Sequence, residues 1–264
     1  DAMSMDQPLI TLQVEDKVAT ITINRPEVKN ALNDACHEQL YNLLSEANER
    51  EDVTVIVLTG SGDAFCSGAD LKSIDLAEQE HFNYGKALRE TYNRLIAFMV
   101  HIGKPLIADI NGTAVGAGLS IALACDFRVA RKEARFALGF LEIGLVPDAG
   151  ASYFLPRLIG YPQSLELAIK GMFDADEAKA MGLIHSIGEA TPYIKRCKQL
   201  PSTAYRLMKQ NFRESFDHHL AELLEMEVTA QREAGASREH RLALERFLKV
   251  PANGKALNME DTKR

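Results

Sequence analysis

An apolar run at residues 53–58, VTVIVL, constrains the fold of this 264-residue chain more than any other feature. A short, nearly continuous apolar run rich in β-branched residues is typical of a strand buried on both faces, as in parallel sheets. Residues 19–23 alternate apolar and threonine side chains, which predicts a half-buried strand. Between the two, residues 40–47 place apolar side chains at helical spacing behind a capping Asn33 or Asp34. Strand, helix and buried strand form a βαβ unit, so we predict an α/β fold.

The same alternation continues along the chain. The expected elements are a helix over about residues 78–100, a strand at 106–110, a helix of small residues at 119–124 and a strand at 127–130. Beyond Pro201 the chain is predicted to be wholly helical, with apolar stripes that must pack on another surface. We therefore expect two regions, a core of residues 1–190 and a helical region of residues 191–264.

Two glycine-rich loops carry most of the functional signal. They are residues 65–71 (FCSGADL) and 111–118 (NGTAVGAG), and each follows a predicted strand and precedes a predicted helix. Backbone N–H groups in such loops, reinforced by the helix dipole, favour a nearby negative charge. Two donors that converge on one point form an oxyanion hole, although a single glycine loop of this kind is also typical of a tight turn.

Composition excludes several classes of function. The net charge of −7 argues against a general nucleic-acid surface. No apolar run approaches the ~20 residues of a membrane span, and no signal peptide is visible, so we expect a cytoplasmic protein, although a processed targeting peptide would leave no trace. The four cysteines lie far apart and predict reduced, mostly buried thiols, and the histidines show no metal-ligand spacing.

Five segments, in order along the chain, resemble the enoyl-CoA hydratase/isomerase (crotonase) superfamily. They are residues 24–32, 60–71, 104–126, 143–147 and 180–184, and the resemblance extends from about residue 9 to about residue 190. It implies a crotonase-like spiral of repeated ββα units with a helical C-terminal trimerisation region, forming a homotrimer or a hexamer of two trimers. It also implies an acyl-CoA thioester as substrate in fatty acid or related metabolism, with coenzyme A entering as part of the substrate, no other cofactor and no metal.

Position-by-position matching to the family motif gives the expected site. The first oxyanion N–H falls on Ser67 and the second on Ala117, where the family more often has glycine. A nucleophilic role for Ser67 is disfavoured because the chain lacks the G-x-S-x-G elbow and an identifiable base. The expected substrate-binding residues are Ser67, Gly68, Ala69, Asp70, Leu71, Lys29, Ala31, Lys72, Gly116 and Phe140. Lys29 and Lys72 could meet the phosphates of coenzyme A, with solvated surface lysines as the alternative.

One departure from the family narrows the reaction. The two glutamates with which hydratases activate water correspond to Ser120 and Phe140, and neither side chain can act as a carboxylate base. Asp148, directly after Pro147, stands where several isomerase branches, including the ring-opening isomerases of the phenylacetate pathway, carry their acidic base. The resemblance therefore favours a 1,3-proton shift by Asp148, with Phe140 keeping the pocket dry. The alternative for Asp148 is an ordinary helix N-cap.

Other readings of the chain stay open. One is a hydratase that uses another carboxylate, such as Glu142. A second is hydrolysis with Asp148 as nucleophile, as in the aryl-CoA dehalogenase branch, but that branch has Trp near the position of Phe140 and this chain has no Trp. A third is an RNA-binding homologue or a silent CoA binder, and the acidic core weighs against RNA. Between Ile187 and Pro201 the chain has roughly ten residues fewer than a typical member, which predicts a shortened helix.

Overall fold

The computed structural model describes residues 7–73 and 75–249. The chain forms two compact units, Asp1–Gln199 and Leu200–Arg264. The boundary lies nine residues later than expected because Cys197 packs in a small apolar cluster with Val55 and Val57 of the main sheet. The short helix that contains Cys197 thus belongs to the first unit.

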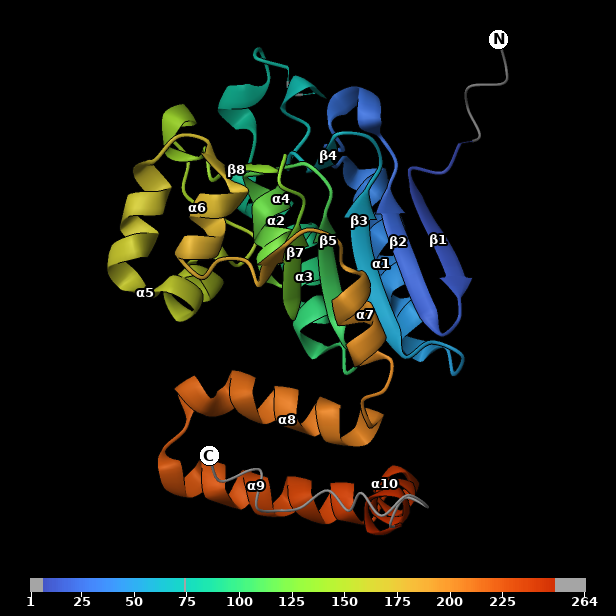
Figure 1. The fold of residues 1–264 in the computed structure, drawn as a ribbon. Helices are drawn as coiled ribbons and strands as arrows, with labels where there is room; N and C mark the ends of the chain where they lie inside the picture. The colour runs from blue at the N-terminus through green and yellow to red at the C-terminus, as the bar shows by residue number, and fades with distance from the viewer. Residues whose placement is uncertain (1–6, 74, 250–264) are drawn as a thin grey trace. The chain divides into compact units, whose positions relative to one another are not determined.

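The first unit is built on two sheets (Figure 1). The main sheet has the order β1-β2-β3-β5-β7-β10, with an antiparallel β1–β2 pair and parallel pairing elsewhere. Its strands are β1 (Ile10–Glu15), β2 (Val18–Ile23), β3 (Val55–Gly60), β5 (Leu106–Ile110), β7 (Phe127–Ala130) and β10 (Ser186–Ile187). The second sheet has the order β4-β6-β8-β9, formed by β4 (Ala64–Cys66), β6 (Thr113–Val115), β8 (Arg135–Ala137) and β9 (Phe173–Asp174).

The strand order confirms the expected spiral. Each of the pairs β3–β4, β5–β6 and β7–β8 places one strand in each sheet before the chain enters helical segments, which is a repeated ββα unit. The helices of this unit are α1 (Asp34–Glu49), α2 (Tyr84–Glu90), α3 (Tyr92–His101), α4 (Ala117–Leu123), α5 (Ala151–Ile169), α6 (Ala175–Ala180) and α7 (Thr191–Cys197). The seven-residue α7 is the helix that the sequence predicts to be short.

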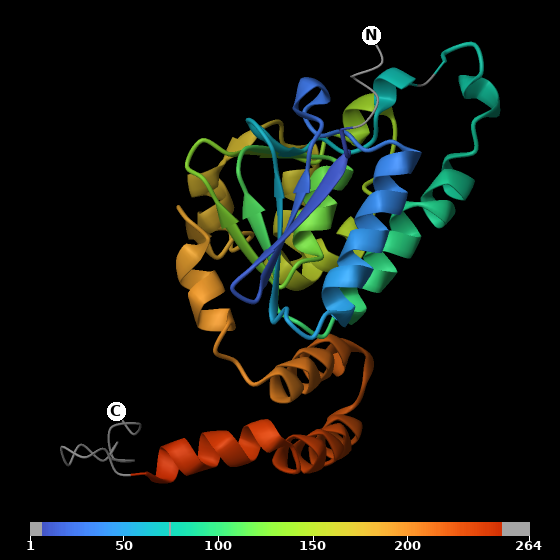
Figure 2. The same ribbon diagram turned by 90° about the vertical axis from the view of Figure 1, so that its right-hand side faces the viewer.

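The sheet faces follow the two-residue period of the strands. Ile56 and Leu58 of β3 belong to the large core cluster that also contains residues of α1 and α3, whereas Val55 and Val57 face the cluster under α7. Figure 2 shows α1 and α3 on one side of the main sheet and α7 on the other. A strand covered on both faces has to be apolar throughout, which explains the run at residues 53–58.

Two local predictions have contrasting outcomes. Asn33 caps α1, because its side chain accepts a hydrogen bond of 2.9 Å from the N–H of Cys36, as predicted.

The prediction of a single helix over residues 78–100 is wrong, because Thr91 (φ −120°, ψ −87°) separates α2 from α3. The Thr91 hydroxyl donates to the Ala87 carbonyl at 2.6 Å, a local bond that competes with the regular helix.

The second unit is helical in its described residues, as the sequence predicts. It contains α8 (Ser202–Glu214), α9 (Leu220–Gly235) and α10 (Arg238–Leu248). Large apolar side chains on these helices are exposed in the single chain, among them Phe212, Phe216, Leu220, Leu224, Leu244, Phe247 and Leu248. Among the described residues, the helices are all too short or too polar to cross a lipid bilayer.

Candidate active site

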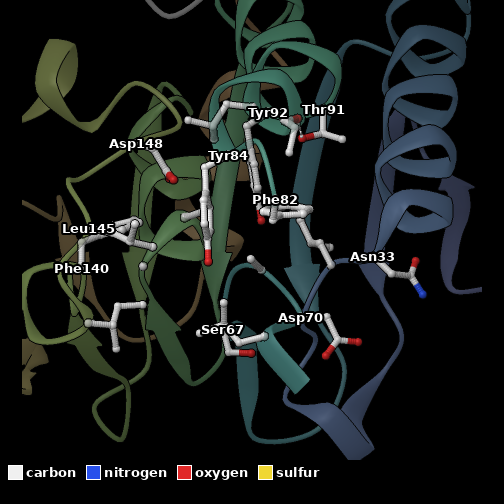
Figure 3. Close-up of a pocket in the computed structure, with 18 of the residues that line it drawn as sticks. Asn33, Ser67, Asp70, Phe82, Tyr84, Thr91, Tyr92, Phe140, Leu145 and Asp148 are labelled. Carbon is white, nitrogen blue, oxygen red and sulfur yellow. Dashed lines mark hydrogen bonds between the residues drawn. The ribbon is translucent and has the colours of Figure 1, made fainter. Parts of the chain in front are cut away.

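The site is a cavity of about 540 Å³ in the first unit. Its walls come from the start of α1, the loop after β4, the α2–α3 segment, the start of α4 and the loop that precedes α5 (Figure 3). Both glycine-rich loops therefore reach one cavity, as the sequence predicts. Of the expected substrate-binding residues, those that line it are Ser67, Ala69, Asp70, Leu71, Gly116 and Phe140, and the expected donor Ala117 lines it as well.

The first oxyanion donor was assigned to the wrong residue. The N–H of Ser67 donates to the Lys29 carbonyl at 3.1 Å, so this amide is already used. Ala69, two residues later, forms a parallel bridge with Leu32. The Leu32 N–H donates to the Gly68 carbonyl at 2.8 Å, and the Leu32 carbonyl accepts from the Asp70 N–H at 3.3 Å. The Gly68 carbonyl and the Asp70 N–H, on either side of Ala69, thus point toward Leu32.

Successive backbone groups of an extended segment point in opposite directions. The Ala69 N–H therefore points away from Leu32, and within the described residues it makes no hydrogen bond. Ala69 lines the cavity, whereas the Ser67 N–H already donates to the Lys29 carbonyl. Ala69 is therefore the better candidate for the first oxyanion donor.

Ala117, the residue predicted to be the second donor, also lines the cavity. Ala117 is the first residue of α4, after a turn at Gly116 with φ +59°, and the N–H of Ala117 has no partner among the described residues. The two loops lie directly against each other, since a Cβ added to Gly68 would lie 3.1 Å from the Ala117 nitrogen. Gly118 packs α4 as tightly on β4, where an added Cβ would lie 2.1 Å from the Cys66 carbonyl oxygen. Glycine is required at both contacts.

Asp148 also lines the cavity. Its Oδ1 atom is buried and has no hydrogen-bond partner among the described residues, and burial raises the pKa of the carboxyl group to about 6. The N-cap alternative for Asp148 is wrong, because α5 begins at Ala151 with Gly150 (φ +86°) in the cap position and no side chain caps it. The Asp148 carboxyl is thus available for chemistry.

Ser120 holds the loop that carries Asp148. Its buried hydroxyl donates to the Asp148 carbonyl oxygen at 2.9 Å and thereby ties this loop to α4, which also carries Ala117. The next residues, Ala149 (φ +53°) and Gly150 (φ +86°), lie in the left-handed region. A strained turn of this kind persists only where neighbouring bonds hold it. Ser120 therefore fixes the position of the Asp148 carboxyl group relative to the Ala117 amide.

Comparison with known proteins agrees with this geometry. The family model described as enoyl-CoA hydratase/isomerase matches residues 13–251. The chain belongs to the enoyl-CoA hydratase/isomerase family. A probable enoyl-CoA hydratase of Rhodobacter capsulatus is 37% identical over 255 residues, covering 92% of this chain and 96% of that protein. The 1,2-epoxyphenylacetyl-CoA isomerase of Escherichia coli is 32% identical, with coverage of 90% and 95%.

The fold is similar to solved structures of the same family. A crystal structure of an enoyl-CoA hydratase/isomerase from Mycobacterium abscessus superposes with a TM-score of 0.84 at 33% identity, covering 90% of this chain and 96% of that one. These relatives include a probable hydratase and an isomerase, so family membership alone leaves the reaction open.

The alternative carboxylate, Glu142, and the thiol of Cys66 both lie in positions that do not suit them for chemistry in the cavity. Glu142 is exposed and is not among the residues that line the cavity. Cys66 lies beside the oxyanion loop but is fully buried, and burial raises the pKa of its thiol to about 12. Phe140 is buried and lines the cavity, as expected, in place of the second hydratase glutamate.

The residues expected to contact coenzyme A do not line the cavity. Lys29 and Lys72 are at least partly exposed and do not line the cavity, and the Lys29 Nζ atom lies 3.5 Å from an Asp63 oxygen. Ala31 is buried, and its carbonyl accepts from the Arg25 guanidinium. Contact of Lys29, Ala31 and Lys72 with coenzyme A stays a prediction.

Several aromatic and imidazole side chains of the cavity were not predicted from the sequence. Phe82, Tyr84, Tyr92 and His37 all line it. The break at Thr91, which makes Tyr92 the first residue of α3, has no strong signal in the sequence. The aromatic residues at positions 82, 84 and 92, close together in the sequence, were the available clue.

Proposed function

We propose that this protein shifts a carbon–carbon double bond of an acyl-CoA thioester by 1,3-proton transfer. The observation that carries the proposal is Asp148, a carboxyl group with a pKa of about 6 and an unpartnered oxygen, in the same cavity as the two unused amides. A base with a pKa near 6 is mostly ionised at neutral pH and still basic enough to accept a proton.

The proposed reaction uses only these groups. The thioester oxygen accepts hydrogen bonds from the amides of Ala69 and Ala117, which stabilises negative charge as it develops. The Asp148 carboxylate removes a proton from the α-carbon of a 3-enoyl group, the double bond moves into conjugation, and the carboxyl group returns the proton to the γ-carbon. No atom or electron is gained or lost, so the reaction needs no cofactor beyond the coenzyme A of the substrate.

Water addition is less well supported. Hydration needs a second acid or base opposite the first, and the two family positions for it hold Ser120 and Phe140. The Ser120 hydroxyl is already bonded to the Asp148 backbone, and Glu142 is exposed and does not line the cavity. This arrangement favours isomerisation over hydration.

Two substrates, supplied separately, test the proposal. The protein should convert a trans-3-enoyl-CoA to the 2-enoyl isomer and leave crotonyl-CoA largely unhydrated. Steady hydration of crotonyl-CoA without isomerisation would overturn the proposal in favour of a hydratase. A covalent aspartyl-acyl adduct at Asp148, detected by mass spectrometry after quenching, would overturn it in favour of a nucleophilic hydrolase.

The pH profile reports the state of Asp148. Because the carboxylate form is the active base and burial raises its pKa to about 6, kcat/KM should rise tenfold per pH unit below that value and level off above it. Isomerase assays between pH 4.5 and 8, with stability checked at each pH, measure this limb. A profile that is flat across this interval would show that another group is the base.

The Ser120 bond should matter for turnover more than for binding. Ser120→Ala leaves the Asp148 carbonyl with its second donor, the Ala151 N–H at 3.1 Å, so we expect a loss of only about 1 kcal/mol in the free energy of unfolding. The loosened carboxyl should lower kcat about tenfold with little change in KM. Ser164→Ala is the matched control, since it deletes a hydroxyl that bonds to the Gly160 carbonyl at 2.7 Å away from the cavity. An equal loss of kcat in both variants would contradict the role of Ser120.

We also propose that the helical unit mediates assembly into a homotrimer or a hexamer of two trimers. Large apolar side chains such as Phe212, Phe216 and Leu220 are exposed on the helices of this unit, and clusters of exposed apolar side chains are typical of protein–protein interfaces. Light scattering should give a mass three or six times the chain mass of 29.2 kDa. A monomeric mass at micromolar concentration would reject the assembly.

A further inference from the structure

The Tyr92 hydroxyl is a buried polar group that the proposed proton transfer does not use. Tyr92 is 5% exposed, lines the cavity and has no hydrogen-bond partner for its Oη atom among the described residues. Figure 3 shows Tyr92 and Asp148 directed into the same cavity from different elements. Buried hydroxyl groups in folded proteins are almost always hydrogen-bonded, so an unpaired one that lines a cavity points to a bound group.

The position of Tyr92 is fixed from two sides. The helix break at Thr91 makes Tyr92 the first residue of α3, and the His37 ring packs edge-on against it with a centroid distance of 4.3 Å. His37 is itself 8% exposed, and burial lowers the pKa of its imidazole to about 4, so the ring is neutral at physiological pH. Tyr92 is therefore held in place as a donor beside a neutral imidazole ring.

The charges of the cavity decide which group fits the hydroxyl. Burial and the nearby Asp148 charge keep the pKa of Tyr92 well above its usual value, so the phenol stays protonated and can donate. The Asp148 carboxylate only accepts hydrogen bonds and repels another anion. A hydrocarbon acyl group leaves the Tyr92 donor unpaired, and an acyl group with a second carboxylate meets the charge of Asp148. A hydroxyl group is neutral, accepts from Tyr92 and carries its own donor.

We propose that Tyr92 forms a subsite for a hydroxyl group on the acyl chain, so that hydroxylated acyl-CoA thioesters are preferred over plain hydrocarbon ones. This inference rests on the proposed acyl-CoA binding but not on the reaction that Asp148 performs. A site built to bond a substrate hydroxyl discriminates strongly against the analogue without it, because the analogue leaves a buried donor unpaired.

Binding of matched ligand pairs tests the subsite. Dissociation constants of the full-length protein are measured by calorimetry for butyryl-CoA against 4-hydroxybutyryl-CoA, and for phenylacetyl-CoA against 2-hydroxyphenylacetyl-CoA. The hydroxyl group lies at a different distance from the thioester in the two pairs, so the pairs test different depths of the cavity. None of the four ligands can be isomerised or dehydrated across the α- and β-carbons. In at least one pair the hydroxylated ligand should bind about tenfold more tightly, and Tyr92→Phe should reduce that ratio to about one.

Tyr193→Phe is the matched control. It removes a hydroxyl from a half-buried tyrosine that does not line the cavity, and the binding ratio should stay at its wild-type value. Tyr92→Phe should also leave the melting temperature unchanged or raise it, because it removes an unpaired buried group. Equal affinity within both pairs, a ratio that survives Tyr92→Phe, or a lowered melting temperature would each overturn the subsite. Failure of all four ligands to bind would overturn the proposed acyl-CoA function as well.

Discussion

Replacement of Asp148 by asparagine should lower kcat for isomerisation about 10³-fold, since general acid–base catalysis contributes about 10²–10⁴. Asparagine has nearly the same shape as aspartate but cannot accept and return a proton. The Oδ1 atom of Asp148 has no partner among the described residues, so the change breaks no bond that the structure describes. Affinity for a saturated acyl-CoA should therefore stay within a factor of a few of the wild-type value.

Stability should change in the opposite direction to activity. Burial raises the pKa of Asp148 from 3.8 to about 6, so the folded state binds the proton more tightly than the unfolded state. The stabilisation from the protonated group is complete below pH 3.8 and is lost as the pH rises through about 6. At pH 7.5 the buried charge of Asp148 destabilises the folded state, and asparagine removes this charge. Asp148→Asn should therefore raise the free energy of unfolding by about 1 kcal/mol, allowing for partial exposure.

Glu142→Gln is the matched control for this variant. It makes the same chemical change at an exposed carboxylate that does not line the cavity, and it should keep wild-type turnover. The assignment fails if Asp148→Asn retains more than a tenth of the wild-type kcat. It fails equally if Glu142→Gln is the variant that loses activity.

Gly68→Ala should have the second largest effect, a loss of about 10²–10³ in kcat, comparable to the removal of one oxyanion donor. Gly68 has φ +86°, and an added Cβ would lie 3.1 Å from the Ala117 nitrogen. The methyl group would thus occupy space next to the second donor and shift the neighbouring Ala69. Kinetics with a 3-enoyl-CoA substrate, together with the unfolding free energy, measure the effect.

Gly62→Ala separates loss of the donor from backbone strain. Gly62 has φ +73°, and an added Cβ would lie 3.1 Å from the Pro26 side chain, outside the residues that line the cavity. Alanine in the left-handed region costs about 1–2 kcal/mol at either position. Both variants should lose stability, but only Gly68→Ala should lose turnover. Similar kcat losses in the two variants would refute the placement of the oxyanion hole.

Much of the fold follows from local features of the sequence. The strands β5 and β7 have the predicted limits, Leu106–Ile110 and Phe127–Ala130, and Asn33 caps α1 as expected. These features depend on residue period and capping chemistry within a few neighbours. The convergence of the two glycine-rich loops was also predictable, because each ends a strand and begins a helical segment of one spiral.

Tertiary contacts decided the details of the site. The choice of Ala69 over Ser67 as donor depends on pairing with Leu32, since the partner strand sets the direction in which each amide points. The free carboxyl of Asp148 depends on the left-handed turn after it and on the distant Ser120 hydroxyl. No local pattern encodes these contacts between residues far apart in the chain.

The sequence by itself therefore determined the α/β class and the two loops, because these are properties of residue type and order. The resemblance to the family implied the spiral and the absence of the hydratase glutamate pair. The tertiary structure alone decided which amides are unused, that Asp148 is not a helix cap, and that Tyr92 reaches the cavity. The physical reason is that hydrogen-bond occupancy and burial belong to pairs of segments that come together only when the chain folds.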